Sequence, residues 1–353
     1  MSLIQRLKKE KGVKDFLYEK DVDFEANFIN TGSVAMNLLM SGRIDGGIPM
    51  YKVAMHASAS AEGKSFFAMK LLKNAQKKGL DCIYVDTEFA FDDTFAASVG
   101  VDTNNVLVFQ SNHIEDIQEF VMKTFKDLTK PEKRNIFIII DSWNGMVTSK
   151  TVEDATVGKD VIDMTISKKK NTFAKLLTGL HCTVHVVNQV YDSLSLYDPL
   201  AIPGGRGLFF ASSTVILGTS KAKSKDGDEV DGIIVTARTK KSRFCQENTK
   251  IKYLIKYDGG IHPVWGIDDD LFEFGVLTKP SAGWYQRDFA KLGLEGEDRK
   301  WRAKDMLENW QEFYKPILNC PYVKKAFEEK YTFKDRGMLD LEDDLKFEET
   351  TEM

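Results

Sequence analysis

The chain has 353 residues, 42% of them hydrophobic, which is enough to bury a large core and is typical of a folded globular protein. Its formal net charge of −4 excludes a uniformly basic protein that coats nucleic acid, although segments of opposite sign cancel in this total. No apolar stretch approaches the ~20 residues of a membrane span and the polar N-terminus is unlike a signal peptide, so we expect a cytoplasmic protein without membrane partners.

The pattern of the chain changes near residue 30. Residues 1–20 are predicted to form a short basic amphipathic helix, and residues 21–30 a linker. From Thr31 onward, apolar runs at 52–57, 81–86, 105–109, 135–141 and 183–188 alternate with helix-length segments at 64–78, 92–99, 113–129 and 160–180. Continuous apolar strands with intervening helices predict an α/β fold whose mostly parallel sheet is covered on both faces.

The first strand of this region runs into a candidate phosphate loop, Ser58-Ala59-Ser60-Ala61-Glu62-Gly63-Lys64-Ser65. In the GxxxxGK[ST] pattern, Lys64 reaches the β- and γ-phosphates of a nucleotide and the Ser65 hydroxyl takes one Mg²⁺ position. Ser58 replaces the first glycine of the pattern, and we expect a backbone cost of about 1–3 kcal/mol there if this residue has a positive φ. The alternative is a surface turn with a helix-capping serine.

Polar residues follow three other strands, where ligands of an open parallel sheet bind. Asp141 ends the run 136–140 and has the form of a Walker B carboxylate that orients Mg²⁺, although it could also cap a helix. Glu88 follows the strand at 82–85 and is our candidate general base for the water that attacks the γ-phosphate; an exposed loop acid is the alternative. Gln189 follows another strand and could sense the γ-phosphate.

Two polar segments are candidates for contacts with a DNA backbone. Residues 190–204 form a connection too long to serve only as a link, and residues 150–160 form a second polar loop before a lysine-rich helical stretch. Aromatic residues in the first segment could stack on bases, whereas adjacent lysines in a helix are often solvated. The candidate DNA contacts are Lys159, Lys168, Lys169, Lys170, Tyr191, Tyr197, Gly204, Gly205 and Arg206.

The last third of the chain has a different pattern. Strands at 213–221, 232–240 and 250–257, with a hairpin-like polar connection at 223–231, predict an antiparallel extension of the sheet. Residues 271–337 are predicted to form a small C-terminal lobe. Residues 338–353 are strongly acidic and are expected to be a solvated tail or a competitor for a basic groove.

These segments together resemble the RecA recombinase family, and most closely its bacteriophage branch. The matching stretches occur in the family order and span nearly the whole chain: residues 31–39, 46–50, 86–88, 188–189, 204–212, 258–261, 279–285 and 300–305. The resemblance implies a RecA-like P-loop ATPase core at 31–270, between an N-terminal helix and linker at 1–30 that serves self-assembly and a C-terminal lobe at 271–337.

The resemblance also implies roles for particular residues. The loop 58–65 binds ATP with Mg²⁺ on Ser65 and Asp141, Glu88 is the catalytic acid, and Gln189 senses the γ-phosphate. Asp92 and Phe95 match the adenine contacts of the family. Lys241 and Arg243 match the two cations that reach a neighbouring subunit's ATP. The DNA loops correspond to residues 151–162 and 190–205.

A member of this family is expected to hydrolyse ATP while it forms a helical filament on single-stranded DNA, pairs it with homologous double-stranded DNA and exchanges strands. We also expect a single-stranded-DNA-binding protein and a loading mediator as partners. Two alternatives share the same nucleotide residues: a hexameric RecA-core helicase, and a non-catalytic recombinase paralogue. A small-molecule kinase is disfavoured because no substrate lid or acceptor pocket is evident in the sequence.

Overall fold

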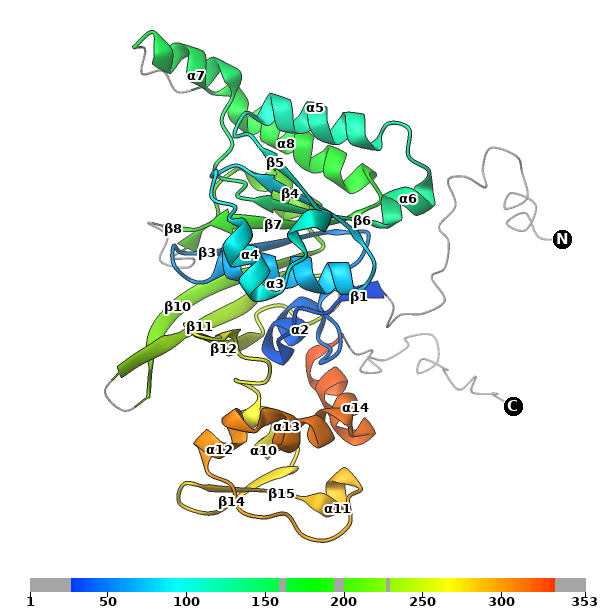
Figure 1. Ribbon diagram of the computed structural model, residues 1–353, viewed down its shortest axis with the longest axis vertical. Coiled ribbons are helices and arrows are strands. Elements are labelled where there is room, and N and C mark those ends of the chain that lie inside the picture. Colours follow the sequence, from blue (N-terminus) through cyan, green and yellow to red (C-terminus); the bar gives the residue numbers. More distant parts are fainter. Residues whose placement is uncertain (1–26, 159–162, 194–199, 227–228, 334–353) are drawn as a thin grey trace, which may run out of the picture.

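The computed structural model describes residues 27–158, 163–193, 200–226 and 229–333 (Figure 1). The expected N-terminal helix, the acidic tail, Lys159 and Tyr197 lie outside these residues. A nine-stranded sheet forms the centre of the fold, in the order β13-β12-β11-β10-β3-β7-β6-β4-β5. The predicted α/β fold is therefore confirmed.

The parallel half of the sheet consists of the strands that the apolar runs predicted. These are β3 (Val53–Ser58), β4 (Asp81–Asp86), β5 (Val106–Gln110), β6 (Ile136–Asp141) and β7 (Thr183–Gln189). All four strand pairs among them are parallel, and β10 joins β3 in parallel as well. Their carboxyl ends therefore meet at one edge of the sheet, where the candidate site lies.

Helices cover both faces of this sheet because successive side chains of each buried strand point to opposite sides. In β6, Phe137 and Ile139 pack in one cluster with helices α2 and α3, whereas Ile138 and Ile140 pack in the other with α5 and α8. The helices of the core are α2 (Val34–Ser41), α3 (Lys64–Lys77), α4 (Asp93–Val99), α5 (Ile114–Phe125), α6 (Lys130–Arg134), α7 (Ser149–Thr156), α8 (Thr165–Gly179) and α9 (Arg206–Ala211). The prediction of a polar loop at 150–160 was wrong for its first half, because Thr148 caps a helix there by accepting a hydrogen bond from the Thr151 N–H.

The antiparallel half contains a longer hairpin than the sequence predicted. Strand β10 (Thr214–Asp226) pairs with β11 (Glu229–Ser242) almost to the turn, so most of the expected polar connection at 223–231 is strand. The two strands project from the core as an arm (Figure 1). Strands β12 (Lys250–Lys256) and β13 (Gly260–Ile261) complete the sheet. Backbone pairing across the hairpin explains why these polar residues are extended.

Three short hairpins or ladders lie outside the main sheet. Strands β1 (Phe28–Ile29) and β2 (Ile48–Pro49) form one, β8 (Tyr191–Asp192) and β9 (Leu200–Ala201) another, and β14 (Leu277–Ser281) and β15 (Trp284–Arg287) the third. None of the helices in the described part of the chain is both long and apolar enough to cross a membrane.

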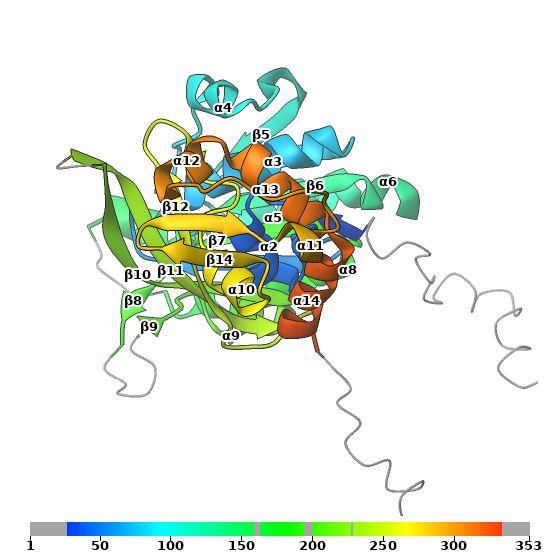
Figure 2. The same cartoon turned by 90° about the horizontal axis from the view of Figure 1, so that it is seen from below.

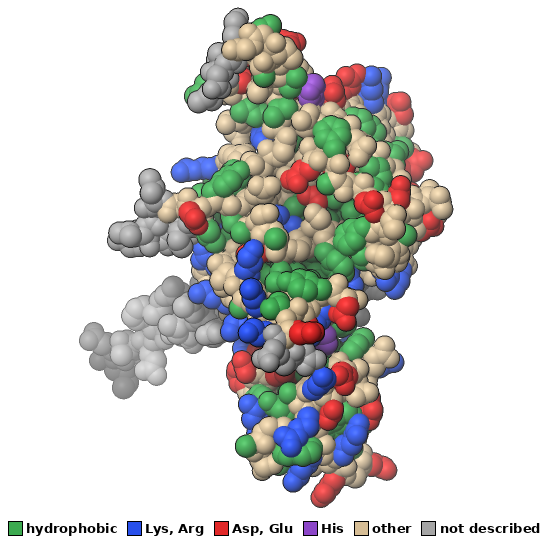
Figure 3. Space-filling view, turned by 60° about the vertical axis from the view of Figure 1, so that its left-hand side comes forward, with side chains coloured by type: hydrophobic (Ala, Val, Ile, Leu, Met, Phe, Trp, Pro, Cys, Tyr) green, Lys and Arg blue, Asp and Glu red, His purple; other side chains and the backbone are tan. Residues whose placement is uncertain are grey.

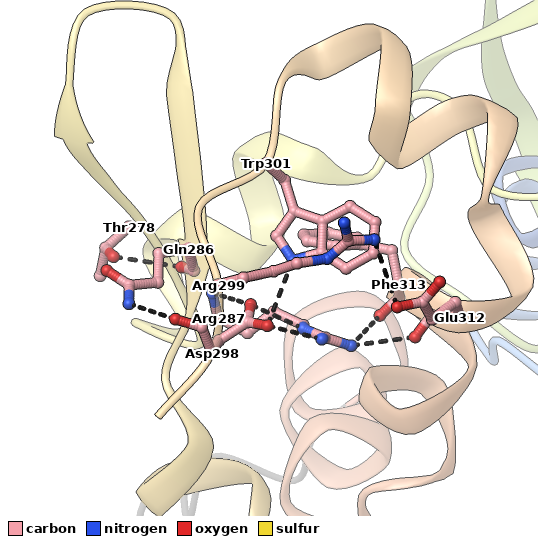
Figure 4. A network of polar contacts seen from close by, with 8 residues as sticks. All are labelled: Thr278, Gln286, Arg287, Asp298, Arg299, Trp301, Glu312 and Phe313. Carbon is pink, nitrogen blue, oxygen red and sulfur yellow. Dashed lines mark hydrogen bonds and ion pairs between the residues drawn. The ribbon is translucent and has the colours of Figure 1, made fainter. Parts of the chain in front are cut away.

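The C-terminal part of the described chain lies beside the core as a lobe (Figures 1 and 2). It contains the hairpin β14–β15 and the helices α10 (Asp268–Glu273), α11 (Phe289–Leu292), α12 (Ala303–Glu308), α13 (Trp310–Asn319) and α14 (Pro321–Tyr331). A buried ion pair holds it together: the Arg287 guanidinium donates two hydrogen bonds to the Asp298 carboxylate, at 2.7 and 2.9 Å (Figure 4). Arg287 also donates to the backbone carbonyls of Glu312 and Phe313, and so connects β15 to α13.

Candidate nucleotide and DNA site

The phosphate loop connects β3 to the first turn of α3. Gly63 has a φ of 75°, a left-handed conformation that favours glycine. The backbone cost that we expected at Ser58 is not found, because this residue ends β3 in extended pairing with Gln189. Ala61 has a positive φ of 58° instead. The strained position therefore lies in the middle of the loop.

Lys64 points back into the loop that precedes it. Its Nζ donates hydrogen bonds to the backbone carbonyls of Ser58 and Ala59, at 3.0 and 2.7 Å. Burial lowers the pKa of Lys64, while the neighbouring Glu62 and Asp141 carboxylates oppose this shift. A partly desolvated ammonium group at the N-terminus of a helix is suited to bind a phosphate, because both the charge and the helix dipole favour an anion.

Asp141 and Ser65 meet beside this lysine. The Asp141 carboxylate is nearly buried and accepts hydrogen bonds from the Tyr84 hydroxyl, at 2.8 Å, and from the Ser65 hydroxyl. Burial raises the pKa of Asp141, and the two hydrogen bonds counteract part of that rise. A carboxylate and a hydroxyl at the end of a phosphate loop are hard oxygen ligands, which fit Mg²⁺.

Glu88 lies at the same edge and contacts two neighbouring strands. Its Oε1 accepts a hydrogen bond from the Ser142 hydroxyl at 2.6 Å, and the Gln189 side-chain amide donates to the same oxygen at 3.4 Å. Ser142 follows β6 and Gln189 ends β7. The structure therefore brings together the candidate base and the candidate γ-phosphate sensor, which are 101 residues apart in the sequence.

Asp86 holds the loop that carries Glu88, a role that we did not predict. Its Oδ1 accepts hydrogen bonds from the backbone N–H groups of Glu88 and Ala90, both at 3.2 Å. Its Oδ2 accepts from the Phe91 N–H at 2.9 Å and from the Gln110 side-chain amide at 3.0 Å. Its position at the carboxyl end of an apolar run was the available signal, but a carboxylate there does not reveal whether it faces a ligand or its own loop.

Asp92 and Phe95 lie at the start of α4. The Asp92 carboxylate caps this helix by accepting a hydrogen bond from the Phe95 backbone N–H at 2.6 Å. The Phe95 ring is 39% exposed and packs edge-on against Phe66 of α3, with 5.9 Å between ring centroids. An exposed aromatic face thus lies beside the helix that begins at the phosphate loop.

Lys241 and Arg243 lie at the opposite edge of the sheet. Strand β11 runs antiparallel to β10, which is itself parallel to β3, so the carboxyl end of β11 lies on the same side of the sheet as the amino end of β3. The Lys241 ammonium donates to the carbonyls of Phe209 and Phe210 in α9, at 2.9 and 3.0 Å. These cations therefore lie away from the phosphate loop of their own chain.

Sequence profiles identify the family. The profile of the RecA N-terminal domain matches residues 2–262, and that of the C-terminal domain of the bacteriophage T4 recombination and repair protein matches residues 271–330. The chain belongs to the RecA family. The T4 recombination and repair protein is UvsX, so the expected resemblance to the bacteriophage branch of the family is confirmed as well.

Curated RecA-family relatives match most of the chain. The recombination and repair protein of Enterobacteria phage T4 is 28% identical over 335 residues, which cover 92% of this chain and 83% of the phage protein. Protein RecA of Chlorobaculum tepidum is 29% identical over 310 residues and 86% of each chain. Protein RecA of Aquifex pyrophilus is 26% identical over 284 residues and 78% of each chain.

The candidate DNA residues of this RecA-family chain occupy different environments. Lys168 is exposed, and Lys169 is paired with the Glu115 carboxylate. Lys170 is 5% exposed, its Nζ lies 3.5 Å from the Asn144 carbonyl, and burial lowers its pKa to about 8. The buried position of Lys170 favours a structural role over direct contact with a phosphate backbone. The sequence could not distinguish these three lysines, because their directions depend on which face of α8 packs.

The long segment after β7 is anchored at both described ends. The Tyr191 hydroxyl accepts a hydrogen bond from the Asn144 side-chain amide at 2.6 Å, although half of the tyrosine side chain is exposed. A Cβ at Gly204 would lie 2.6 Å from the buried ring of Trp143, so this glycine permits close packing. Gly205 precedes α9, and Arg206 begins the helix with an exposed side chain.

Proposed function

We propose that this RecA-family chain is an ATP-dependent DNA recombinase that assembles as a helical filament on single-stranded DNA and exchanges strands with a homologous duplex. The observation that carries the proposal is the contact between Glu88 and Gln189 beside the phosphate loop. Gln189 directly precedes the segment 190–205, which is our candidate DNA loop. A change at the γ-phosphate would therefore reach that segment through one side chain.

The roles of the nucleotide residues follow from their positions. Lys64 would exchange the carbonyls of Ser58 and Ala59 for the phosphates of ATP, which are stronger partners for an ammonium group. Ser65 and Asp141 would hold Mg²⁺, which supplies charge neutralisation at the phosphates. Glu88 would orient and deprotonate the attacking water, while Asp92 and Phe95 would contact the adenine.

Catalysis in this proposal needs two subunits. Lys241 and Arg243 lie at the sheet edge opposite the phosphate loop of their own chain, so we assign them to the ATP of a neighbouring subunit. Cations supplied in this way stabilise the charge that develops during phosphoryl transfer. Hydrolysis would then depend on filament assembly, for which we propose that residues 1–30 provide a contact.

The proposed DNA surface consists of the segments 151–162 and 190–205 together with the exposed side chains of Lys168, Tyr191 and Arg206. Basic side chains would neutralise phosphates, and the tyrosine would stack on a base. We extend the proposal to two helper proteins, a single-stranded-DNA-binding protein and a loading mediator. The acidic residues 338–353 would compete with DNA for basic surface.

Strand exchange between a circular single strand and a homologous linear duplex tests the proposal directly. We expect joint molecules and exchanged products with ATP, and their loss in the Lys64→Ala variant. Electron microscopy of the same mixtures should show extended helical filaments. ATP hydrolysis without strand exchange, together with closed six-membered rings on the DNA, would refute the recombinase and favour the helicase.

A further inference from the structure

The phosphate loop carries a carboxylate at Glu62, directly before Gly63 and Lys64. The Glu62 side chain is only 4% exposed. Its carboxylate accepts hydrogen bonds from the Ser58 hydroxyl and the Ala59 backbone, but among the described residues Oε2 has no hydrogen-bond partner. A negative charge here opposes the triphosphate that the proposed function places on this loop.

Strand β10 provides the space that this carboxylate occupies. A Cβ at Gly218 would lie 2.6 Å from Glu62 Oε2 and 2.5 Å from the Ser58 Cβ. Glycine at position 218 therefore lets both side chains turn toward β10. Ser58 occupies the position of the first glycine in the loop pattern, and its hydrogen bond with Glu62 explains this serine as a partner of the acid.

A second lysine reaches the loop from the same strand. Lys221 of β10 donates a hydrogen bond from Nζ to the Ser60 carbonyl at 3.1 Å. Burial raises the pKa of Glu62, whereas Ser58, Lys221 and Lys64 act in the opposite direction. The Glu62 carboxylate is therefore influenced by an ammonium group from its own loop and by another from β10.

The charged side chains of the phosphate loop itself are Glu62 and Lys64. Lys64 and Glu62 alone sum to zero, whereas a phosphate loop without an acid has the full positive charge of its lysine. With Lys221 the sum returns to +1. Lysine and arginine side chains gather on the face where the arm points toward the viewer (Figure 3). Lys223 lies two residues beyond Lys221 in β10 and therefore on the same side of the strand.

We propose that Lys221 is a positioning residue of the nucleotide site, which balances the Glu62 carboxylate and holds it against β10, away from the phosphates. This inference rests on the proposed function, because it assumes that the loop binds ATP. It predicts that Lys221 matters only while residue 62 carries a charge. An independent phosphate contact would instead act in the same way whatever residue 62 is.

A double-mutant cycle on the full chain distinguishes a positioning role of Lys221 from an independent phosphate contact. The measurement is the dissociation constant of a fluorescent ATP analogue at low and high salt. We expect Lys221→Ala to raise it about three- to tenfold at low salt and less at high salt, as for a partly screened charge pair. Lys221→Arg should retain most of the affinity. Lys223→Ala is the matched control and should bind like the wild type.

The variant Glu62→Gln should bind the analogue at least as tightly as the wild type, and adding Lys221→Ala to it should change the dissociation constant less than twofold. An unchanged affinity in Lys221→Ala, or an equal loss in the Glu62→Gln background, would overturn the inference. If the wild-type chain itself bound no analogue, or Lys64→Ala bound it equally well, the proposed function would fail instead.

Discussion

Replacing Asp86 by asparagine tests whether this residue positions the candidate base. The substitution keeps the shape of the side chain but replaces one carboxylate oxygen by an NH₂ group. In the best arrangement this group faces Phe91 and Gln110, and the Gln110 amide can turn to accept from it. The Phe91 N–H is then left without an acceptor, and the hydrogen bonds from Glu88 and Ala90 lose their charge assistance.

The magnitude follows from these contacts. One buried donor without a partner costs about 1–3 kcal/mol, and a neutral acceptor binds about half as strongly as a charged one. We therefore expect the free energy of unfolding to fall by about 2–4 kcal/mol. A displacement of Glu88 by about 1 Å would lower kcat about 100-fold, with little change in the KM for ATP because the phosphate loop is untouched.

The assay is DNA-stimulated ATP hydrolysis at a temperature well below the unfolding transition of the variant, together with thermal unfolding. Asp81→Asn is the matched control, because Asp81 is exposed at the other end of β4 and accepts one hydrogen bond from Asn135. It should leave both kcat and stability almost unchanged. A kcat for Asp86→Asn within twofold of the wild type would refute the positioning role.

Three further outcomes are expected. Arg287→Met should destabilise the fold by about 3–5 kcal/mol, because it leaves the buried Asp298 carboxylate without its positively charged partner. The control Arg299→Met breaks an exposed ion pair and should cost at most ~1 kcal/mol. Equal losses of stability in denaturant titrations of the two variants would contradict this. Burial acts to raise the pKa of Asp298, but the hydrogen bonds from Arg287 outweigh this effect, so the pKa is lowered. The stability that this pair adds is therefore present above the unfolded-state pKa of about 3.9 and is lost as the pH falls through the lower folded-state pKa. Acid titration of the wild type and of Arg287→Met would measure this loss. Filaments that mix Lys241→Ala with Lys64→Ala subunits should recover part of the ATP hydrolysis that each variant lacks alone, and no recovery in co-assembled filaments would argue against cations acting between subunits.

Much of the fold was predictable because it depends on neighbouring residues. The parallel strands are buried on both faces, so each appears as a continuous apolar run such as 136–140. The phosphate loop has a recognisable spacing for a similar reason, because the eight contiguous residues 58–65 contain the whole turn from β3 into α3, including Gly63. The candidates Asp141, Glu88 and Gln189 followed from one rule, that parallel strands place their carboxyl ends at the same edge.

Other features depend on which residues face each other across strands and helices. The extended β10–β11 arm forms because backbone pairing outweighs the polar composition of its tip. Lys170 is buried and Lys168 exposed because only one face of α8 packs against the sheet. Asp86 had no predicted role, and it holds its own loop through four hydrogen bonds from residues that only the tertiary structure places around it.

The sequence by itself determined the order of strands and helices along the chain, the position of the phosphate loop and the family. These features depend on hydrophobic periodicity and on motifs of contiguous residues. The tertiary structure alone decided that Glu62 turns toward Gly218 and that Lys221 reaches Ser60. The positions of β10 and the phosphate loop are about 160 residues apart in the chain, and the register that brings them together arises from the packing of the whole sheet.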